Sequence, residues 1–298
     1  MQISSNLGRA DDIASLDAIK GLIFENFTCS ASAEVSPLDE GFAHHFKAIG
    51  GQTRARFALE CCQKLGIGAR DAEVIAASVE ALHNASLVLD DVQDNSTTRR
   101  GHASVAHEHG DNVAIGLAHR LVATSFECLT NLSQSNQLGP MIKKINRAIA
   151  DTVDGQTYDL RTDRSNTSLE DNLKSAKNKS GPLFALAFEL PLIFAKLEKY
   201  LPFAHQAACQ FGLGYQIIDD LKDRASDKAG GQTSNIALVM ELTAGTTTSH
   251  DAVAKTVQIG FDCLTDAREQ SRALPSDSGG SLVWASERLL TQLQTFNA

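Results

Sequence analysis

Apolar residues recur at steps of three and four along most of the chain, which is the spacing of one face of an α-helix. Near the N-terminus this pattern is formed by Ile13, Leu16, Ile19, Ile23 and Phe27. Comparable runs predict further helices, among them Val113–Leu132, Phe203–Leu221, Ala252–Leu274 and Leu282–Phe296. Strand-like alternation, long linkers and solenoid repeats are not seen between them. The pattern therefore predicts an all-α protein, a single-domain helical bundle over residues 1–298.

Prolines, glycines and an aspartate mark where some of these helices begin or bend. Pro37 is predicted to open a helix that stops before Gly50-Gly51, and Asp71 to cap the helix that follows from Ala72 onward. Pro182 is expected to kink or restart the helix that carries it. Polar connections are predicted at Ser165–Ser168 and at Ala229–Asn235.

Composition and charge narrow the class of protein. The chain has 298 residues, 43% apolar and 21% charged, with a net charge of -9, which disfavours a nucleic-acid-binding role. The six cysteines show no CxxC spacing, as expected for reduced, packed thiols. The N-terminal segment does not resemble a signal peptide, and apolar runs stay short of the ~20 residues that cross a bilayer. We therefore expect a cytoplasmic protein with no membrane span.

The stretch from Leu82 to Gly110 carries the first chemical signal. Asp90, Asp91 and Asp94 end an apolar helical run, and Asp90 and Asp94 share one helical face because they are four residues apart. Such carboxylates repel each other unless a cation lies between them, and a divalent ion completed by substrate phosphates is the obvious candidate. Arg99 and Arg100 follow directly and are suited to binding an anion.

A second cluster repeats the same DDxxD spacing. Asp219, Asp220 and Asp223 lie at the predicted C-terminal end of the helix Phe203–Leu221. Negative charge at a helix C-terminus is unfavourable by about 0.3–1 kcal/mol. Two such clusters therefore predict bound cations rather than solvated surface charge.

Further residues could bind anions, but each has an alternative explanation. Arg54 and Arg56 follow Gly50-Gly51 at a helix start, where they form either an anion site or a solvated basic turn. Lys179 and Ser180 precede Pro182. They could equally well form a phosphate-binding site or belong to an exposed lysine face of the helix. His83 lies two turns before Asp90, yet an isolated histidine there is more often a packed residue than a ligand.

Taken together and in order, the motifs resemble those of the trans-isoprenyl diphosphate synthases of the polyprenyl synthetase family. The segments that carry the resemblance are GGQTRARF, EALHNASLVLDDVQDNSTTRRG, GQTYDL, KSGPLF and YQIIDDLKD. Similarity extends from about Leu38 to the C-terminus. The resemblance implies a helical fold of the isoprenoid synthase type with a deep central cavity, usually as a homodimer.

The resemblance also implies roles for individual residues. Three Mg²⁺ ions would be held by Asp90 and Asp94 on one wall and Asp219 on the other, supported directly or through water by Asp91, Asp220 and Asp223. The residues implied at the allylic diphosphate are Arg99, Lys179, Ser180 and Gln216. The residues implied at isopentenyl diphosphate are Arg56, His83 and Arg100. Catalysis would rest on Asp90, Asp94, Asp219, Lys179 and Arg99.

The implied reaction is a Mg²⁺-dependent, head-to-tail condensation of an allylic diphosphate with isopentenyl diphosphate. In the family, the residues four and five before the first motif aspartate often close the substrate cavity, and here they are Ser86 and Ala85. Both are small, whereas relatives that stop at fifteen carbons often carry an aromatic ring there. We therefore expect a product of twenty carbons or somewhat longer.

Several positions depart from the family pattern. Gln52-Thr53 replaces a usual lysine after Gly50-Gly51, and Ala118-His119 replaces a Gly-Asp pair. A proline and a histidine usual after RRG correspond to Ala103 and Ala106, although His107 is adjacent. A lysine contact common after the second motif is absent or supplied by Lys228.

Two alternatives to chain elongation follow from these departures. One is a lyase or cyclase of the class I terpene synthase type, which ionises an allylic diphosphate without condensing it. Arg54, Arg56, His83 and Arg100 argue against it, since a lyase needs no second diphosphate site. The other is a non-catalytic partner subunit, against which both intact aspartate motifs count.

Overall fold

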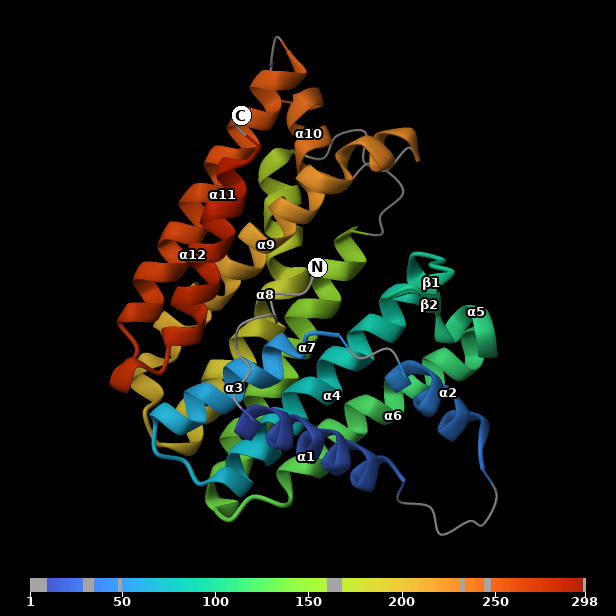
Figure 1. The fold of residues 1–298 in the computed structure, drawn as a ribbon, viewed down its shortest axis with the longest axis vertical. Helices are drawn as coiled ribbons and strands as arrows, with labels where there is room; N and C mark the ends of the chain where they lie inside the picture. Colours follow the sequence, from blue (N-terminus) through green and yellow to red (C-terminus); the bar gives the residue numbers. More distant parts are fainter. Residues whose placement is uncertain are drawn as a thin grey trace. The chain divides into compact units, whose positions relative to one another are not determined.

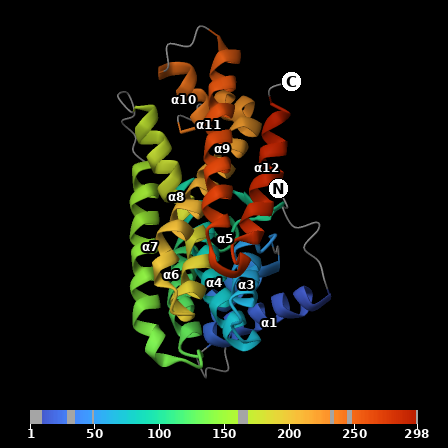
Figure 2. The same cartoon turned by 90° about the vertical axis from the view of Figure 1, so that its left-hand side faces the viewer.

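A computed structural model describes residues 10–28, 35–47, 50–159, 168–230, 234–243 and 248–296. The chain divides into two compact units, residues 1–142 and 143–298, and each is described by itself. Helices account for nearly all regular structure in the described parts of both units, as Figure 1 and the perpendicular view in Figure 2 show. The predicted all-α class is confirmed, whereas one domain over residues 1–298 stays a prediction.

The first unit is built around one long apolar helix. Its elements are α1 (Ala10–Phe27), α2 (Pro37–Lys47), α3 (Thr53–Lys64), α4 (Ala69–Gln93), β1 (Thr98–Arg99), β2 (His102–Ala103), α5 (Val105–His109), α6 (Asp111–Leu129), the short 3₁₀ helix η1 (Ser135–Gln137) and the start of α7 (Leu138–Asp159). Helix α4 packs along α6, with α3 and α1 also against it, and Figure 1 shows α4 and α6 side by side. This burial makes α4 the core helix of the unit.

Among the described residues, α4 is the one helix long and apolar enough to be a candidate membrane span by length and composition. However, 72% of its most apolar window is buried inside the structure. Its side chains therefore find their apolar environment in the protein core, as in the central helix of a globular fold. This burial, rather than a bilayer, explains the composition of α4.

The start of α4 differs from the sequence prediction. Gly68 is the N-cap and the helix begins at Ala69, so Asp71 lies within the first turn rather than at the cap. The Asp71 carboxylate instead accepts hydrogen bonds from the backbone N–H of Ser133 at 2.8 Å and from its hydroxyl at 2.6 Å. Asp71 thus ties the start of α4 to the loop after α6.

A small β-hairpin follows α4, which the sequence did not predict. Thr98 pairs with Ala103 and Arg99 with His102 in an antiparallel ladder. The two residues between the strands, Arg100 and Gly101, have φ values of 55° and 81°. Positive φ at both central residues is the requirement of a type I′ hairpin turn, which Gly adopts without strain. Two-residue strands are too short to produce a detectable alternation in the sequence.

The second unit contains the longest helices. Its elements are the remainder of α7, α8 (Leu169–Phe194), η2 (Glu198–Tyr200), α9 (Leu201–Ala229), α10 (Ile236–Thr243), α11 (Ser249–Arg272), η3 (Pro275–Asp277) and α12 (Gly280–Gln294). Helix α9 packs along α8 and α11, and α12 covers α11. At the crossing of α8 and α9 a Cβ on Gly181 would lie 2.8 Å from Cys209 Cα, so only glycine permits this approach.

Three predictions for the second unit need correction. Pro182 does not restart the helix, because α8 is continuous from Leu169 to Phe194. Helix α9 extends past Leu221 to Ala229, since the added residues include the good helix formers Lys, Arg and Ala. Helix α10 lies just after the predicted Gly-rich loop, where no helix was expected. Of the predicted polar turn at 165–168, only Ser168 lies within the described residues, as the N-cap of α8.

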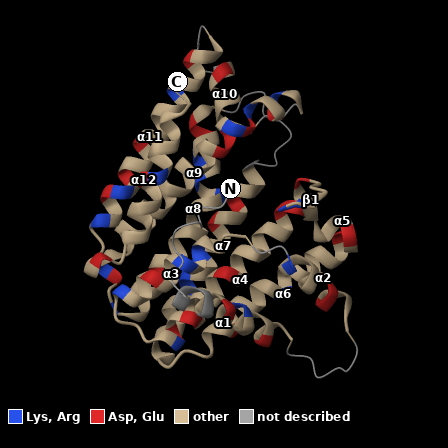
Figure 3. Ribbon diagram, viewed as in Figure 1, with Lys and Arg blue, Asp and Glu red and all other residues tan. Residues whose placement is uncertain are grey.

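The surface charge of the second unit is mixed. Figure 3 shows acidic and basic residues interspersed along α11 and α12. This pattern differs from the single basic face typical of nucleic-acid-binding proteins. It agrees with the net charge of -9.

Candidate active site

The first aspartate motif lies at the C-terminal end of α4, as predicted. Asp90 and Asp91 belong to the last turn, and Asp94 is the C-cap residue. Asp91 is buried, Asp90 is half-buried and Asp94 is exposed. The motif therefore offers two accessible carboxylates, Asp90 and Asp94, at the end of a helix whose dipole already favours a cation.

Asp91 binds the guanidinium group of Arg99 from the adjacent hairpin. Arg99 Nε lies 3.0 Å from Oδ1 and 3.2 Å from Oδ2, and Nη2 lies 2.6 Å from Oδ1. Asp91 has only 2% of its side-chain surface exposed, whereas Arg99 has 31%. Both Asp91 oxygens are thus engaged by Arg99. In this arrangement Asp91 fixes the orientation of Arg99, whose own surface stays partly accessible to an anion.

The second arginine of the motif is positioned by the hairpin turn and by Gly50. Arg100 is the first central residue of the type I′ turn. A Cβ on Gly50 would lie 2.4 Å from the central carbon of the Arg100 guanidinium. Glycine is therefore required for this close approach, which brings the predicted Gly50-Gly51 loop to the predicted Arg100.

His83 lies next to Arg54. Arg54 Nη1 is 3.1 Å from His83 Nε2, so the ring nitrogen accepts from the guanidinium and Nδ1 carries the proton. Burial, followed by the charges of Arg54 and Arg100, holds the pKa of His83 well below its ordinary value. Among the described residues, the buried Nδ1 of His83 has no hydrogen-bond partner. A neutral His83 is thereby left with a donor for a ligand.

A buried polar network that the sequence did not reveal supports these groups. The side chain of Asn84 donates to the Glu80 carbonyl at 2.8 Å and to Glu80 Oε1 at 3.3 Å, and its Oδ1 accepts from His45 Nε2 at 2.9 Å. Burial raises the pKa of Glu80, while the charges of Arg54 and Arg100 lower it. Glu80 is thus the buried counter-charge of two arginines at the candidate isopentenyl site. Helical spacing from His83 is its only sequence signal.

Arg56 is held in the first turns of α3. Its Nε donates to the Gly51 carbonyl at 3.2 Å. Gln52, which stands where the family usually has lysine, is the N-cap with φ 48°, and its side chain makes no cap hydrogen bond. The Gln52 side chain therefore leaves the first backbone N–H groups of α3 able to face an anion.

The second aspartate motif lies inside α9, not at its end. Asp219 is half-buried and Asp223 is exposed. Burial raises the pKa of Asp219; Lys222, 3.4 Å away, opposes this, and the charge of Asp223 adds to it. The argument from charge at a helix C-terminus therefore does not apply here, because α9 continues to Ala229. Burial and mutual repulsion of the carboxylates take its place as the reason why a cation would be favourable.

Asp220 is buried and held by hydrogen bonds within the second unit. Burial raises its pKa to about 7. Its carboxylate accepts from Gln216 Nε2 at 2.8 Å and from the backbone N–H of Ile236 at 2.7 Å. Asn235 also donates to the Asp220 carbonyl at 2.7 Å. Asp220 thus anchors the start of α10 against α9 and orients Gln216.

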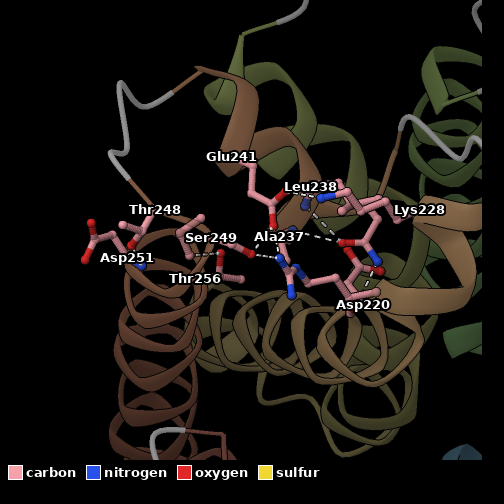
Figure 4. Close-up of polar contacts among 12 residues, drawn as sticks. Asp220, Lys228, Ala237, Leu238, Glu241, Thr248, Ser249, Asp251 and Thr256 are labelled. Atoms are coloured by element: carbon pink, nitrogen blue, oxygen red, sulfur yellow. Dashed lines mark hydrogen bonds and ion pairs between the residues drawn. The ribbon is translucent and has the colours of Figure 1, made fainter.

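Lys228 binds a neighbouring carboxylate in this structure. Its Nζ lies 3.1 Å from Glu241 Oε2, and Figure 4 shows the two side chains facing each other. Arg224 also contacts Glu241. The suggestion that Lys228 replaces the missing family lysine stays a prediction, since in this arrangement Glu241 already balances it.

The GQTYDL and KSGPLF motifs come together within the second unit. A Cβ on Gly155 of α7 would lie 2.7 Å from the backbone nitrogen of Lys179 on α8, and the Ser175 hydroxyl donates to the Gly155 carbonyl at 2.9 Å. Gln156 is buried, and neither of its amide atoms has a hydrogen-bond partner among the described residues. The segment carrying Lys179 and Ser180 thus lies against α7 beside an unsatisfied amide. The side chain of Asp159 lies outside the described residues.

The donor chemistry of both motifs fits magnesium completed by substrate. Mg²⁺ binds carboxylate oxygens, keeps several waters and commonly takes one or two carboxylates plus substrate phosphates. Within the described ranges, no group of three Asp, Glu, His or Cys side chains could hold a metal ion by itself. Asp90 with Asp94, and Asp219 with Asp223, therefore fit a metal that a diphosphate helps to bind, rather than a closed protein cage.

The fold and family were established by comparison with known proteins. The polyprenyl synthetase family model matches residues 35–234. The chain belongs to the polyprenyl synthetase family. Geranylgeranyl pyrophosphate synthetase from Pyrococcus horikoshii has a similar structure, with a TM-score of 0.81, 21% identity and coverage of 93% of this chain and 96% of that chain. At this identity the likeness establishes the isoprenoid synthase fold.

Sequence relatives agree with this family assignment. A short chain isoprenyl diphosphate synthase of Methanocaldococcus jannaschii is 28% identical over 154 residues, 51% of this chain and 47% of the relative. A geranylgeranyl pyrophosphate synthase of Geoglobus acetivorans is 27% identical over 251 residues, 77% of this chain and 79% of the relative. Polyprenyl synthetase relatives of this kind support the predicted enzyme class, a prenyltransferase.

Proposed function

We propose that the protein condenses an allylic diphosphate with isopentenyl diphosphate, head to tail and with Mg²⁺, and releases inorganic diphosphate. The observation that carries this proposal is the arginine–histidine cluster of the first unit. Arg54, His83 and Arg100 surround a buried counter-charge, Glu80, in addition to the separate Asp91–Arg99 pair. A protein that only ionised one diphosphate would need one cationic site, whereas a condensing enzyme needs two.

In the proposed reaction the first unit binds both diphosphates. Arg99, oriented by Asp91, binds the allylic diphosphate beside Asp90 and Asp94. Arg56, Arg100 and the Nδ1–H of neutral His83 bind the diphosphate of the second substrate. Because His83 is uncharged, it donates a hydrogen bond without adding a positive charge that would oppose Arg54 and Arg100.

In the proposed reaction the second unit supplies further ligands for metal and diphosphate. Asp219 and Asp223 would hold metal, while Lys179, Ser180 and Gln216 would contact the leaving diphosphate. Bound Mg²⁺ supplies Lewis-acid neutralisation of the charge that grows on that diphosphate. Positive charge on Lys179 and on Arg99 lowers the barrier to breaking the carbon–oxygen bond.

Carbon–carbon bond formation then needs positioning rather than a nucleophilic side chain. The double bond of the second substrate attacks the allylic cation, a new carbon–carbon bond forms, and one proton is lost. The departing diphosphate accepts this proton, and the product is five carbons longer. The contribution of the chain is to hold two diphosphates side by side and to exclude water from the cation.

The finer features of the proposal follow the same reasoning. Ser86 is half-buried and Ala85 buried, and their small size supports a product of twenty carbons or somewhat longer. A homodimer and a cytoplasmic location are proposed from the family resemblance.

Product identification tests the proposal. Purified protein is incubated with Mg²⁺, dimethylallyl diphosphate and isopentenyl diphosphate, and the products are identified by mass. Longer prenyl diphosphates are expected. Hydrocarbons or alcohols formed without consumption of isopentenyl diphosphate would indicate a lyase instead. No turnover with either substrate would indicate a non-catalytic subunit and contradict the proposal.

A further inference from the structure

A cavity of about 520 Å³ opens in the second unit, and its lining includes Asn178, which directly precedes Lys179 in the chain. Residues that line it include Lys144, Lys177, Pro202, His205, Gln206 and Cys209. They come from α7, α8 and the N-terminal half of α9. None of these six belongs to the motifs assigned to prenyl transfer, although Cys209 packs against Gly181 of the KSGPLF segment.

Three side chains at this cavity form a linear relay. Glu189 Oε1 lies 3.1 Å from His205 Nδ1, and His205 Nε2 lies 3.6 Å from Cys209 Sγ. The carboxylate and the thiol therefore contact opposite nitrogens of one imidazole ring. This arrangement does not chelate a metal, because the ring lies between the two groups. A carboxylate that orients an imidazole base, which in turn contacts a nucleophile, is the arrangement that activates a thiol.

The histidine of the relay is held in its protonated form. Glu189 is buried, and its Oε1 also lies 2.6 Å from Lys144 Nζ. The hydrogen bond to Cys209, followed by that to Glu189, raises the pKa of His205 to about 10. His205 is thus protonated at neutral pH beside the sulfur. An adjacent imidazolium stabilises a thiolate.

The cavity also attracts anions. Lys144, Lys177 and His205 supply three positive charges. The nearby negative charges are Glu189 and Asp266, the second of which interacts with Lys177 and accepts from Gln206 at 3.0 Å. Positive charge therefore exceeds negative charge around the sulfur. An anionic reactant would approach Cys209 more readily than a neutral one.

Cys209 differs from the other cysteines that the structure describes. All five of these cysteines, Cys209 included, are buried, and burial raises the pKa of Cys62, of Cys128 to about 12 and of Cys263 to about 11. Thiols whose pKa is raised in this way are unreactive because the attacking species is the thiolate. Cys209 alone among these five contacts a histidine ring and lines the cavity.

We propose that Cys209 is a modification site, at which the thiolate paired with His205 forms a mixed disulfide with small anionic disulfides in the cavity lined by Lys144 and Lys177. The thiolate attacks one sulfur of the disulfide, RS–SR. The Cys209–SR bond forms, the RS–SR bond breaks, and RS⁻ leaves and takes a proton from water. No further oxidant is required, because the incoming disulfide is reduced as Cys209 is oxidised.

The test compares two disulfides on the full-length chain. A Cys29→Ser background removes the cysteine whose side chain lies outside the described residues. Glutathione disulfide is the anionic probe and 2-hydroxyethyl disulfide the neutral one, with adducts counted by intact mass and located by peptide mapping. One adduct is expected, at Cys209, reversed by a thiol reductant and absent from Cys209→Ser. An adduct at another cysteine, or none, would overturn the proposal.

Two further variants separate activation of the thiol by His205 from attraction of the anionic probe by Lys177. His205→Gln is expected to slow modification by both probes about tenfold, because it removes the imidazole that contacts the Cys209 sulfur. Lys177→Gln should slow the reaction of Cys209 with glutathione disulfide and leave its reaction with the neutral probe unchanged. Lys255→Gln, an exposed lysine on α11, is the matched control and should change neither rate. Unchanged rates in both His205→Gln and Lys177→Gln would contradict the proposal, and circular dichroism verifies that each variant is folded.

Discussion

Asp91 and Arg99 form a bidentate ion pair that joins the end of α4 to the hairpin that follows it, with Nη2 2.6 Å from Oδ1. The aspartate is buried and the arginine is partly exposed. One member of the DDxxD motif is therefore positioned to orient an anion-binding arginine, while its neighbours Asp90 and Asp94 remain accessible. The aspartates of this one motif thus have different roles, which leads to the first prediction.

Asp91→Asn should release Arg99 without removing the metal-binding pair. Hydrogen bonds to charged groups contribute about 1.5–3 kcal/mol, so we expect a loss of this order in the free energy of unfolding. The KM for the allylic diphosphate should rise. Asp71→Asn is a matched control at the other end of α4, where the loss of bonds to Ser133 should lower stability by about 1 kcal/mol and leave KM unchanged. An Asp91→Asn enzyme with wild-type KM would contradict the orienting role.

Gly50→Ala should weaken binding of isopentenyl diphosphate specifically. The new methyl group would overlap the Arg100 guanidinium, which is the mobile end of a long side chain and will move away. Stability should therefore change little, while loss of a charge-assisted contact should raise the KM for isopentenyl diphosphate by about tenfold or more. Gly139→Ala, where a methyl group meets nothing within 4 Å, should leave both properties unaltered. Steady-state kinetics with each substrate varied in turn measures the difference.

Enlarging the residues before the first motif should shorten the product. Ala85→Phe is expected to shift the product distribution toward fewer carbons, provided that the chain folds. Ala85 is 1% exposed, so the ring must displace core atoms, whereas Ser86→Phe acts at a half-buried position. Wild-type enzyme should elongate farnesyl diphosphate. If it does not, or if both folded variants keep the wild-type distribution, the residues that close the substrate cavity lie elsewhere.

Stability should fall in mild acid because of His45. Burial lowers the pKa of His45 from 6.5 to about 4. Between these two values the unfolded chain binds a proton that the folded chain excludes, so stability present above pH about 6.5 is lost as pH falls. From pH 7 to pH 5 the His45 contribution should amount to about 2 kcal/mol. In urea unfolding, the free energy of unfolding of His45→Gln should fall less from pH 7 to pH 5 than that of the wild type, by that amount. An equal fall in both proteins would rule out His45 as the source.

Most of the helical fold and the two aspartate motifs could be predicted from sequence because both are local patterns. Apolar spacing identified α1, α6, α11 and α12 within a few residues, and DDxxD spacing placed Asp90 and Asp94 on one face. The end of α9 was missed because charged residues after Leu221 carry no apolar periodicity, although they favour helix. The hairpin at Arg99 was missed because two residues cannot show alternation.

Contacts between distant residues could not be predicted in the same way. The network of His45, Asn84 and Glu80 joins α2 to α4, and nothing in either segment alone indicates the pairing. The Glu189–His205–Cys209 relay similarly depends on how α8 packs on α9. Buried polar partners are set by tertiary packing, so the sequence pattern marks the individual residues at best as unexplained polar positions.

The most direct test of the account is the stoichiometry of the reaction. Isotopically labelled isopentenyl diphosphate and dimethylallyl diphosphate are supplied with Mg²⁺, and inorganic diphosphate release is measured together with label incorporated into longer diphosphates. The account predicts one diphosphate released for each isopentenyl unit incorporated, with both lost on chelation of the metal. Diphosphate release without incorporation of label would contradict it.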